Sequence, residues 1–577
     1  MNRLRLRRRP VPASGPWPAS VPPALRRVCA ARGVLGPEDA ELRLARLAPP
    51  EGLSGMASAV ELLRAAIAED RHIVVVGDFD CDGATGTAVA VRGLRMLGAR
   101  RVSYRVPHRL MHGYGLSLAL VDDLRRLRPD LVLTVDSGIA CHAGIAAARA
   151  EGWRVLVSDH HLPASSLPEA DAIVNPNLPG DAFPSKALAG VGVVFYLLLA
   201  LRQRLRADGA FARRLPEPDL GELLDLVAVG TVADLVPLDY NNRLLVAAGL
   251  RRLREGRCRP GLRALVELAG REPALLSAGD IGFGLAPRLN AAGRLDDMSL
   301  GIECLLCDEP ERARELALML DGINAERREL QAQMLEQAER LAAATVEGQG
   351  GLPDLVCVHD PAWHAGVVGL VASKLKDRWH RPVIAFAGEE EGEGMLKGSA
   401  RSIPGLHIRD ALAAVDARHP GLIGRFGGHA MAAGLSLAPE QLAAFAEAMR
   451  VEVGRRLSEE QRLCELWTDG ELAPEEIERG LAERLRLAGP WGQGFPEPVF
   501  EGEFELLEAR EVGRGHLRMR LRHADGGPVL GGIQFGGWTG ERPPGRLRLA
   551  YELDLDDWGG RRGVQLRVRH LEPAPMV

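Results

Sequence analysis

The sequence predicts an α/β protein of several domains that ends in an all-β module. Three observations lead to this prediction. Short β-rich runs alternate with helical stretches from about residue 70, long apolar-periodic helices follow, and short strands with turn signals fill the chain from about residue 460. Alternating strands and helices imply βαβ units and a mostly parallel sheet. A chain of 577 residues also exceeds the size at which single cores stop growing, roughly 250–300 residues.

We expect five segments in chain order. A Pro-, Ala- and Arg-rich arm (1–50) precedes a domain (51–240) whose strand candidates are HIVVV, RVSYRV, LVLTV, RVLVS and AIVN. A long helical connector (241–345) leads through the Gly-rich stretch VEGQGGLPD, a boundary signal, to a second α/β domain (346–455). The last segment (456–577) contains HLRMRLRH, GPVLGGIQF, GRLRLAYELDL and GVQLRVRHLE, which predict a small β-barrel.

Composition narrows the class of protein. The net charge of −5 gives no overall basic signature, so nucleic-acid binding would have to come from local basic patches. The eight cysteines are scattered, which indicates a reducing compartment, and the close pair Cys304 and Cys307 is expected to be buried in a helix. The basic start lacks the apolar core of a secretory signal, and the apolar run 187–201 is short for a membrane span. We therefore expect a cytoplasmic protein without a membrane segment.

Acidic residues and histidines follow three predicted strands at the point where each ends. They are Asp78, Asp80 and Asp82 after HIVVV, Asp136 after LVLTV, and Asp159, His160 and His161 after RVLVS. Because the carboxyl ends of parallel strands open on one crevice, these side chains are expected to converge. Clustered carboxylates repel one another unless cations neutralise them. Oxygen ligands with one or two imidazoles suit Mn²⁺ or Mg²⁺, so the sequence predicts a metal cradle.

Two aspartates have alternative interpretations. Asp159 is either part of the cradle, a cap or turn residue, or a residue that orients one of the histidines. Asp234, in VGTVADLVPL, sits in an apolar helix where an unpaired carboxylate is costly, so it is a further candidate ligand for a pair of metals. A capping or turn role is the alternative for Asp234.

The motifs, taken in order, resemble those of the DHH phosphoesterase family. DFDCDG, TVDSG, SDHH and GTVADLVPL look like its successive motifs. RVPHR, HGYG, FGLAPRLNAAGR, WHAGVVGLVASKL, GSARS and FGGHAMAAG are similar to the family's single-strand-specific exonucleases with their second, DHHA1 domain. GQGFPEPVF and the β-rich tail resemble the OB-type barrel of those enzymes. The likeness covers nearly everything from about residue 50, and Gly86 departs from it, since relatives often carry a small hydroxyl residue there.

The resemblance implies a 5′→3′ exonuclease that hydrolyses single-stranded DNA by two-metal chemistry, for DNA repair and recombination. It implies two divalent cations, Mn²⁺ or Mg²⁺, held by five ligands: Asp80, Asp82, Asp136, His160 and Asp234, with Asp136 as the bridge. His161 would lie beside the scissile phosphate. Asp78 would orient the first ligands.

The resemblance also implies contacts to the strand. Arg109, Ser399 and Arg401 would hold a 5′-terminal phosphate in a narrow cleft between the first two domains. The second group of predicted strand contacts comes from PRLNAAGR and comprises Arg288, Asn290 and Arg294. His429, in GGHAMAAG, either contacts DNA or only shapes a turn.

The barrel carries its own signal. In LRMRLRH, Arg518, Arg520 and Arg522 alternate with apolar residues, and period two places them on one face of a strand. With Trp538 and Trp558 in nearby loops, this face suits single-strand binding by an OB fold. The alternative is a solvated outer face whose arginines are cancelled by acidic residues.

Other functions stay open from the sequence alone. A DHH phosphodiesterase for short oligonucleotides or cyclic dinucleotides would resemble the first two domains but usually lacks such a tail. A non-catalytic replication scaffold would show eroded ligands, and an inorganic pyrophosphatase would lack the extra domains. The expected partners are single-stranded DNA, a helicase and a single-strand binding protein, and the chain is expected to act as a monomer. The physiological metal and the processivity stay open.

Overall fold

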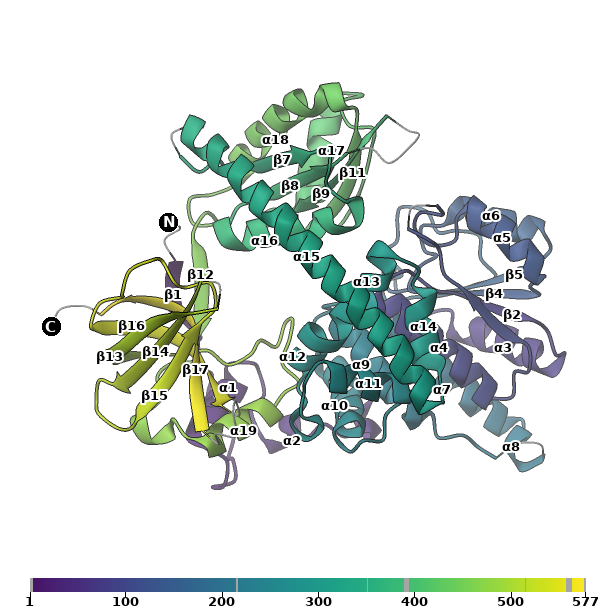
Figure 1. Cartoon of the computed structure of the whole chain (residues 1–577). Coiled ribbons are helices and arrows are strands. Elements are labelled where there is room, and N and C mark those ends of the chain that lie inside the picture. The colour runs from purple at the N-terminus through teal and green to yellow at the C-terminus, as the bar shows by residue number, and fades with distance from the viewer. Residues whose placement is uncertain are drawn as a thin grey trace. The chain divides into compact units, whose positions relative to one another are not determined.

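The computed structural model describes residues 4–109, 111–213, 216–349, 351–388, 394–513, 515–556 and 563–574. Figure 1 labels the helices and strands along the chain. The chain divides into two compact units. One contains Met1–Arg7 with Ile323–Trp467, and the other contains Arg8–Gly322 with Thr468–Val577. In the second unit, parts far apart in the sequence therefore form one body.

A five-stranded parallel sheet organises the larger unit. Its order is β3-β2-β4-β5-β6, and its strands are β2 (Ile73–Val76), β3 (Val102–Arg105), β4 (Leu131–Val135), β5 (Arg154–Ser158) and β6 (Ala172–Val174). The central strands β2 and β4 are buried along their whole length, and apolar except for Thr134, because helices cover both faces.

Alternate residues of β2 enter different cores. Ile73 and Val75 pack in the core that also holds side chains of α3 (Met56–Ala68), α4 (Cys81–Met96) and α7 (Gly190–Ala207). Val74 and Val76 pack with side chains of α5 (Leu118–Leu124) and α6 (His142–Ala150) on the opposite face. This arrangement leaves the carboxyl ends of the strands open for a site.

Helices fill the connector. After the turn Leu220–Leu223 come α9 (Leu224–Ala233), α10 (Tyr240–Arg254), α11 (Pro260–Leu268), α12 (Ala278–Asp280), the π-helical turn η6 (Ile281–Leu285), α13 (Ala286–Leu295), α14 (Ser299–Leu306) and α15 (Pro310–Gln349). Helix α15 continues through VEGQ, so the helix ends three residues after the predicted start of the second domain. Cys304 is buried in α14, and all eight cysteines are free.

The smaller unit contains a mixed sheet of order β10-β11-β9-β8-β7. Its strands are β7 (Val356–Asp360), β8 (Val383–Ala387), β9 (Leu396–Arg401), β10 (Arg425–Gly428) and β11 (Ala432–Leu437). Only β7 and β8 pair in parallel; the remaining pairs of this sheet are antiparallel. Helices α16 (Ala365–Trp379), α17 (Ile408–Arg418) and α18 (Leu442–Arg456) complete this α/β domain.

The C-terminal strands close into a barrel of order β13-β14-β15-β17-β16. They are β13 (Phe500–Val512), β14 (His516–His523), β15 (Val529–Gln534), β16 (Arg546–Asp556) and β17 (Gly563–Pro573), preceded by α19 (Arg479–Leu487). The predicted fold class, a parallel-sheet domain, a helical connector, a second α/β domain and a terminal barrel, is confirmed.

The N-terminal residues pack against the segment that leads into the barrel. Strand β1 (Leu4–Arg8) pairs with β12 (Cys464–Thr468), and the arm continues through α1 (Pro23–Ala30) and α2 (Pro37–Ala40). Arg32 of the arm forms a fully buried ion pair with Asp469 at 2.7 Å. One hydrophobic core runs from the parallel sheet through the connector into the barrel. In the part of the chain that the structure describes, no helix combines the length and the apolarity that a membrane crossing needs.

Candidate active site

The acidic loop after β2 turns directly into α4. Asp78 follows the strand, Asp80 caps α4 by accepting a hydrogen bond from Gly83 N at 2.9 Å, and Asp82 lies in the first helical turn. A Cβ at Gly83 would lie 2.6 Å from the backbone of Asp78, so this close turn requires glycine. The three aspartates thus follow the strand as predicted, but the helix already begins at Cys81, so Asp82 is a helical residue.

Backbone amides support Asp82. Its two carboxylate oxygens accept hydrogen bonds from Gly190 N at 2.6 Å and Val191 N at 3.0 Å, the first two residues of α7. The amino ends of α4 and α7 thus both meet the acidic cluster, where helix dipoles favour negative charge. These amide hydrogen bonds offset part of the repulsion among the carboxylates of DFDCD, so the expectation that only cations do so is wrong.

One nitrogen of His160 lies among three carboxylates. Its Nε2 atom is 3.0 Å from Asp136 Oδ1, 3.4 Å from Asp234 Oδ2 and 3.9 Å from Asp82 Oδ2. A ring nitrogen carries at most one proton and cannot donate to three acceptors. Asp234 reaches the cluster from the carboxyl end of α9, as its C-cap residue. The convergence of carboxylates and imidazole is the arrangement that a metal cradle requires.

The donor set fits divalent cations. The buried oxygens Asp78 Oδ1 and Asp234 Oδ2 accept no hydrogen bond from the described residues. Burial, followed by the charge of Asp80, raises the pKa of Asp82 to about 7. Burial and neighbouring carboxylates raise the pKa values of Asp78, Asp136 and Asp234 well above the usual range. Three sets of mutually close donor atoms result: Asp136, His160 and His161; Asp82, His160 and Asp234; Asp78, Asp80 and Asp136.

Asp159 orients the histidine pair. Its Oδ1 accepts hydrogen bonds from the backbone N–H groups of His160 and His161 at 2.7 and 3.0 Å and lies 2.8 Å from His161 Nδ1, while Oδ2 accepts from Ile139 N at 2.9 Å. Burial alone would raise the pKa of Asp159, but the contacts with His161 hold it below the usual value. Its geometry therefore matches the orienting alternative.

Tyr114 is a site residue that sequence reasoning missed. Its hydroxyl donates to the main-chain oxygen of Asp136 at 3.1 Å and lies 3.4 Å from His161 Nδ1. Its ring meets Phe79 and His161 edge to face at 6.2 and 6.0 Å between centroids. Asp136 has the left-handed φ of 60°, a conformation that costs energy unless neighbours hold it. The signal in the sequence was an aromatic residue between two glycines in HGYG.

Arg109 and Asn290 both contact the surroundings of the acidic loop. The Arg109 guanidinium lies 3.9 Å from the centroid of the Phe79 ring, and its Nε donates to Gly293 O at 3.0 Å. Burial lowers the pKa of Arg109. Asn290 Oδ1 accepts a hydrogen bond from Cys81 N at 2.9 Å. The structure thus brings two of the predicted strand contacts beside the cluster.

Arg288 is held inside the protein. Its Nε pairs with Asp321 at 2.8 Å, and its other nitrogens donate to Gly284 O at 2.5 Å and Leu268 O at 3.2 Å. Asp321 lies on α15, 33 residues away, which local sequence patterns do not reveal. These contacts do not support the expected grip of Arg288 on the strand. Arg294 lies in the last turn of the same helix, α13.

Arg401 lies in a hydrogen-bonded cluster of the smaller unit. It ends β9, and its guanidinium donates to Ser399 Oγ at 2.9 Å, Ser373 Oγ at 3.2 Å and Ala400 O at 2.8 Å. Burial lowers the pKa of Arg401, and no carboxylate pairs with it among the described residues. A half-buried arginine without an acidic partner is suited to an anion. His429 is exposed in the β10–β11 turn, where its N–H donates to Ala432 O.

The barrel arginines lie on one strand face, as period two predicts, but acidic residues share that face. Arg520 pairs with Glu508 at 3.0 Å and Arg522 with Glu505 at 3.3 Å. Arg518 instead lies opposite Arg510, and no carboxylate pairs with either of these two in the described barrel. Trp538 is partly buried against the core, and Trp558 lies outside the described residues.

Comparison with known proteins places this architecture in a family. Models of the DHH family N-terminal domain, the DHHA1 domain and the RecJ OB domain match residues 72–231, 340–454 and 468–570. The single-stranded-DNA-specific exonuclease RecJ of Dickeya dadantii (strain 3937) is 52% identical over 573 residues, 99% of both chains. The chain belongs to the RecJ family. RecJ of Escherichia coli (strain K12) is 48% identical and covers 99% of this chain and 100% of its own.

Solved RecJ structures agree with the predicted metals. RecJ from Thermus thermophilus in complex with Mn²⁺ is 30% identical, with a TM-score of 0.79 over 100% of this chain and 80% of that one. The Mg²⁺ complex of the same protein gives a TM-score of 0.75. The resemblance to DHH phosphoesterases is confirmed, and full-length RecJ matches favour an exonuclease over the phosphodiesterase and scaffold alternatives.

Proposed function

We propose that this chain hydrolyses single-stranded DNA from the 5′ end, in the 5′→3′ direction, with two divalent cations, Mn²⁺ or Mg²⁺. The observation that carries the proposal is the convergence of Asp82, Asp136 and Asp234 on His160 Nε2 in a RecJ-family chain. Bound cations of this kind lower the pKa of water and stabilise charge on a reacting phosphate.

The chain's own residues have distinct tasks in this proposal. The residues that would hold the cations are Asp80, Asp82, Asp136, His160 and Asp234. His160 and Asp136 each belong to two of the donor sets, and Asp136, as the carboxylate of the two, would be the shared ligand. Asp159 and Tyr114 hold His161, which we place beside the scissile phosphate. Asp78, whose carboxylate lies close to those of Asp80 and Asp136, orients these ligands.

The direction of degradation is set by the residues that bind the 5′-terminal phosphate, which are Arg401, Ser399 and Arg109. Arg401 and Ser399 form a hydrogen-bonded pair without an acidic partner, which suits a terminal phosphate. Arg109 approaches the acidic loop through Phe79. The strand enters by its 5′ end, and the first internal linkage meets the cluster.

Digestion of end-labelled single- and double-stranded DNA with Mn²⁺, Mg²⁺ and EDTA tests the function. We expect nucleotides to be released from the 5′ end of single strands with either cation, and no cleavage in EDTA. Release that begins at the 3′ end, or equal digestion of duplex, would overturn the proposal.

The cellular setting is part of the same proposal. We propose a cytoplasmic monomer that serves DNA repair and recombination, supplied with unwound strands by a helicase and a single-strand binding protein. All eight cysteines are free, which suits a reducing compartment.

Replacing Tyr114 by phenylalanine should weaken cation binding. The variant loses the hydrogen bond to Asp136 O and keeps the ring contacts with Phe79 and His161. A neutral hydrogen bond contributes about 0.5–1.5 kcal/mol, so Mn²⁺ affinity should fall roughly two- to tenfold. Calorimetric Mn²⁺ titration measures it, with Tyr240→Phe, whose hydroxyl contacts Glu41 O instead, as control. Equal affinity in both variants would contradict the assigned role.

Arg510 and Arg518 should dominate the salt dependence of strand binding by the barrel. Each phosphate contact to a single strand contributes about 0.7 to the slope of log affinity against log salt. Alanine at either position should flatten the slope by about that amount. Arg520→Ala and Arg522→Ala are the matched controls and should change it less, because Glu508 and Glu505 already compensate them. Equal slopes for all four variants would contradict this. Point variants are preferable to truncation, because one core joins the barrel to the rest of its unit.

A further inference from the structure

Phe283 is an aromatic side chain that is exposed to solvent. It is 84% exposed, more than any other large apolar side chain that the structure describes. Burying such a ring contributes about 1.5–3 kcal/mol, which the folded chain forgoes here. The residue sits in the π-helical turn η6 between Gly282 and Gly284. π-Helical turns are rare and often lie at functional sites.

Several contacts hold this turn in place. Arg288 donates to Gly284 O and Leu268 O and pairs with Asp321. Asp280, just before the turn, completes a capping box with Ser277. The exposed ring is therefore carried on a braced segment. The sequence predicted that Arg288 contacts DNA. In the structure Arg288 is held by contacts within the protein, and Phe283, earlier in the same segment, is the exposed residue.

The turn leads directly to the acidic cluster. Helix α13 begins right after η6 and carries Asn290, which accepts from Cys81 N, and Gly293, whose carbonyl accepts from Arg109. At 1.5 Å per residue, Asn290 lies about 10 Å along this helix from Phe283. One short helix thus links the exposed ring to the loop that holds the proposed metal ligands.

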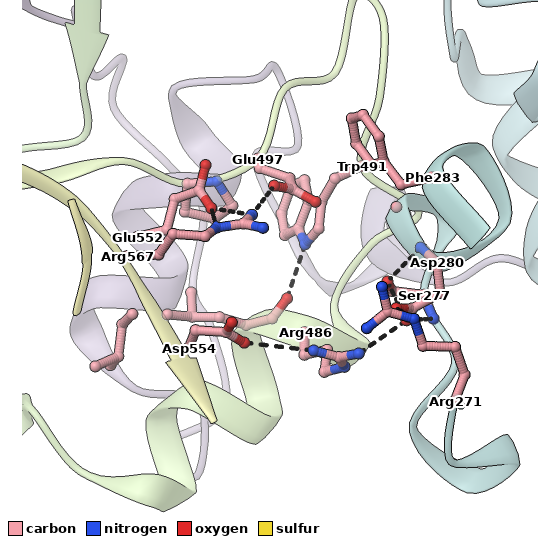
Figure 2. A pocket seen from close by; sticks show the side chains of 14 residues that line it. Arg271, Ser277, Asp280, Phe283, Arg486, Trp491, Glu497, Glu552, Asp554 and Arg567 are labelled. Atoms are coloured by element: carbon pink, nitrogen blue, oxygen red, sulfur yellow. Dashed lines mark hydrogen bonds and ion pairs between the residues drawn. The ribbon is translucent and has the colours of Figure 1, made fainter. Parts of the chain in front are cut away.

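Phe283 also lines a pocket of about 190 Å³ between the connector and the C-terminal segment (Figure 2). The pocket's arginines are already paired: Arg486 with Asp280 at 2.8 Å and Asp554 at 3.4 Å, and Arg567 with Glu497 at 3.0 Å. Their charge is compensated, so the pocket does not suit a phosphate. In Figure 2 the Phe283 ring points away from these ion pairs.

We propose that Phe283 stacks against an unpaired base of the substrate strand. The inference rests on the proposed function and adds a base-binding subsite outside the metal cluster. A planar ring exposed on a braced turn matches the π-face that every base presents, whatever its sequence. The arginines of the neighbouring pocket are already paired with carboxylates. We therefore expect the base and sugar of the nucleotide, rather than its phosphate, to bind beside the ring.

Strand binding in EDTA, which prevents hydrolysis, tests this subsite. A series of 3′-labelled oligonucleotides carries one abasic site, moved a single position at a time from the 5′ end. For the wild-type chain, one or two abasic positions should weaken binding roughly 5- to 150-fold, the usual range for base–aromatic stacking. Phe283→Ala should lose about the same factor on intact strands and show no further loss at those positions. Phe283→Trp should retain the position effect, and Phe283→Leu should lose most of it.

The control is Leu318→Ala on α15, another exposed apolar residue, at 51% exposure, which should bind all strands like the wild type. Stacking is refuted if Phe283→Ala binds every strand as tightly as the wild type does. The proposed function still stands in that case, provided that the wild type degrades single strands. Phe283 would then be assigned to a protein partner. Equal abasic profiles in wild type and Phe283→Ala would refute it too. A wild type that fails to bind or degrade single strands would refute the proposed function itself.

Discussion

Replacing Asp136 should abolish nuclease activity and leave the fold intact. Asp136 belongs to two donor sets and lies 3.0 Å from His160 Nε2. Its removal relieves repulsion within a buried acidic cluster, so the folded state should not suffer from the lost charge. Loss of even an outer partner of a metal ligand costs 10–100-fold, so loss of a shared ligand should lower turnover by more than about 100-fold.

Two variants separate metal loss from backbone strain. Asp136 has φ 60°, a conformation that asparagine tolerates better than alanine. Asp136→Asn should therefore keep the turn and lose activity, whereas Asp136→Ala should lose activity and some stability. Turnover on end-labelled single strands, Mn²⁺ calorimetry and thermal unfolding provide the measurements, with the exposed Asp122→Ala as control. Near-wild-type turnover in Asp136→Asn would contradict the metal assignment.

Arg401→Ala should erase most of the preference for 5′-phosphorylated over 5′-hydroxyl ends. The guanidinium is half-buried, donates to Ser399 and Ser373, and has no acidic partner among the described residues. A charge-assisted contact contributes about 1.5–3 kcal/mol, or roughly ten- to a hundredfold in affinity. The rate ratio on matched phosphorylated and hydroxyl oligonucleotides measures the effect.

Two further variants sharpen this test. Arg401→Lys keeps the charge but lacks the planar fork, so it should recover only part of the preference. Arg409→Ala, exposed in the same unit, should keep the wild-type ratio. A structural role for Arg401 predicts a less stable variant with the ratio unchanged. Wild-type degradation of 5′-blocked strands from their 3′ ends would contradict the assignment of polarity.

Parallel-sheet geometry explains why the acidic cluster was predictable. Asp78, Asp136 and His160 follow three neighbouring strands, and such strand ends meet at one edge of the sheet. The helix start at Cys81 was harder to place, because Asp80 serves as both a predicted ligand and a cap. The alternation in β14 was also readable, since period two is a local property.

Partners supplied by distant segments were not predictable. The bulge between Leu506 and Glu508 sets the register that places Glu508 beside Arg520 and leaves Arg510 opposite Arg518. No pattern near Asp82 in the sequence predicts its hydrogen bonds from the amides of Gly190 and Val191, which lie more than a hundred residues away. Such pairings depend on tertiary packing, which local patterns do not encode.

The amide support of Asp82 bears on how the enzyme gains and loses its cations. Many small metal domains are unfolded until the ion arrives, because the ion itself organises the ligands. Here two helix ends and a buried core hold the carboxylates in position beforehand. We therefore expect the chain to stay folded when its cations are removed by a chelator, and to regain activity when Mn²⁺ or Mg²⁺ is added back.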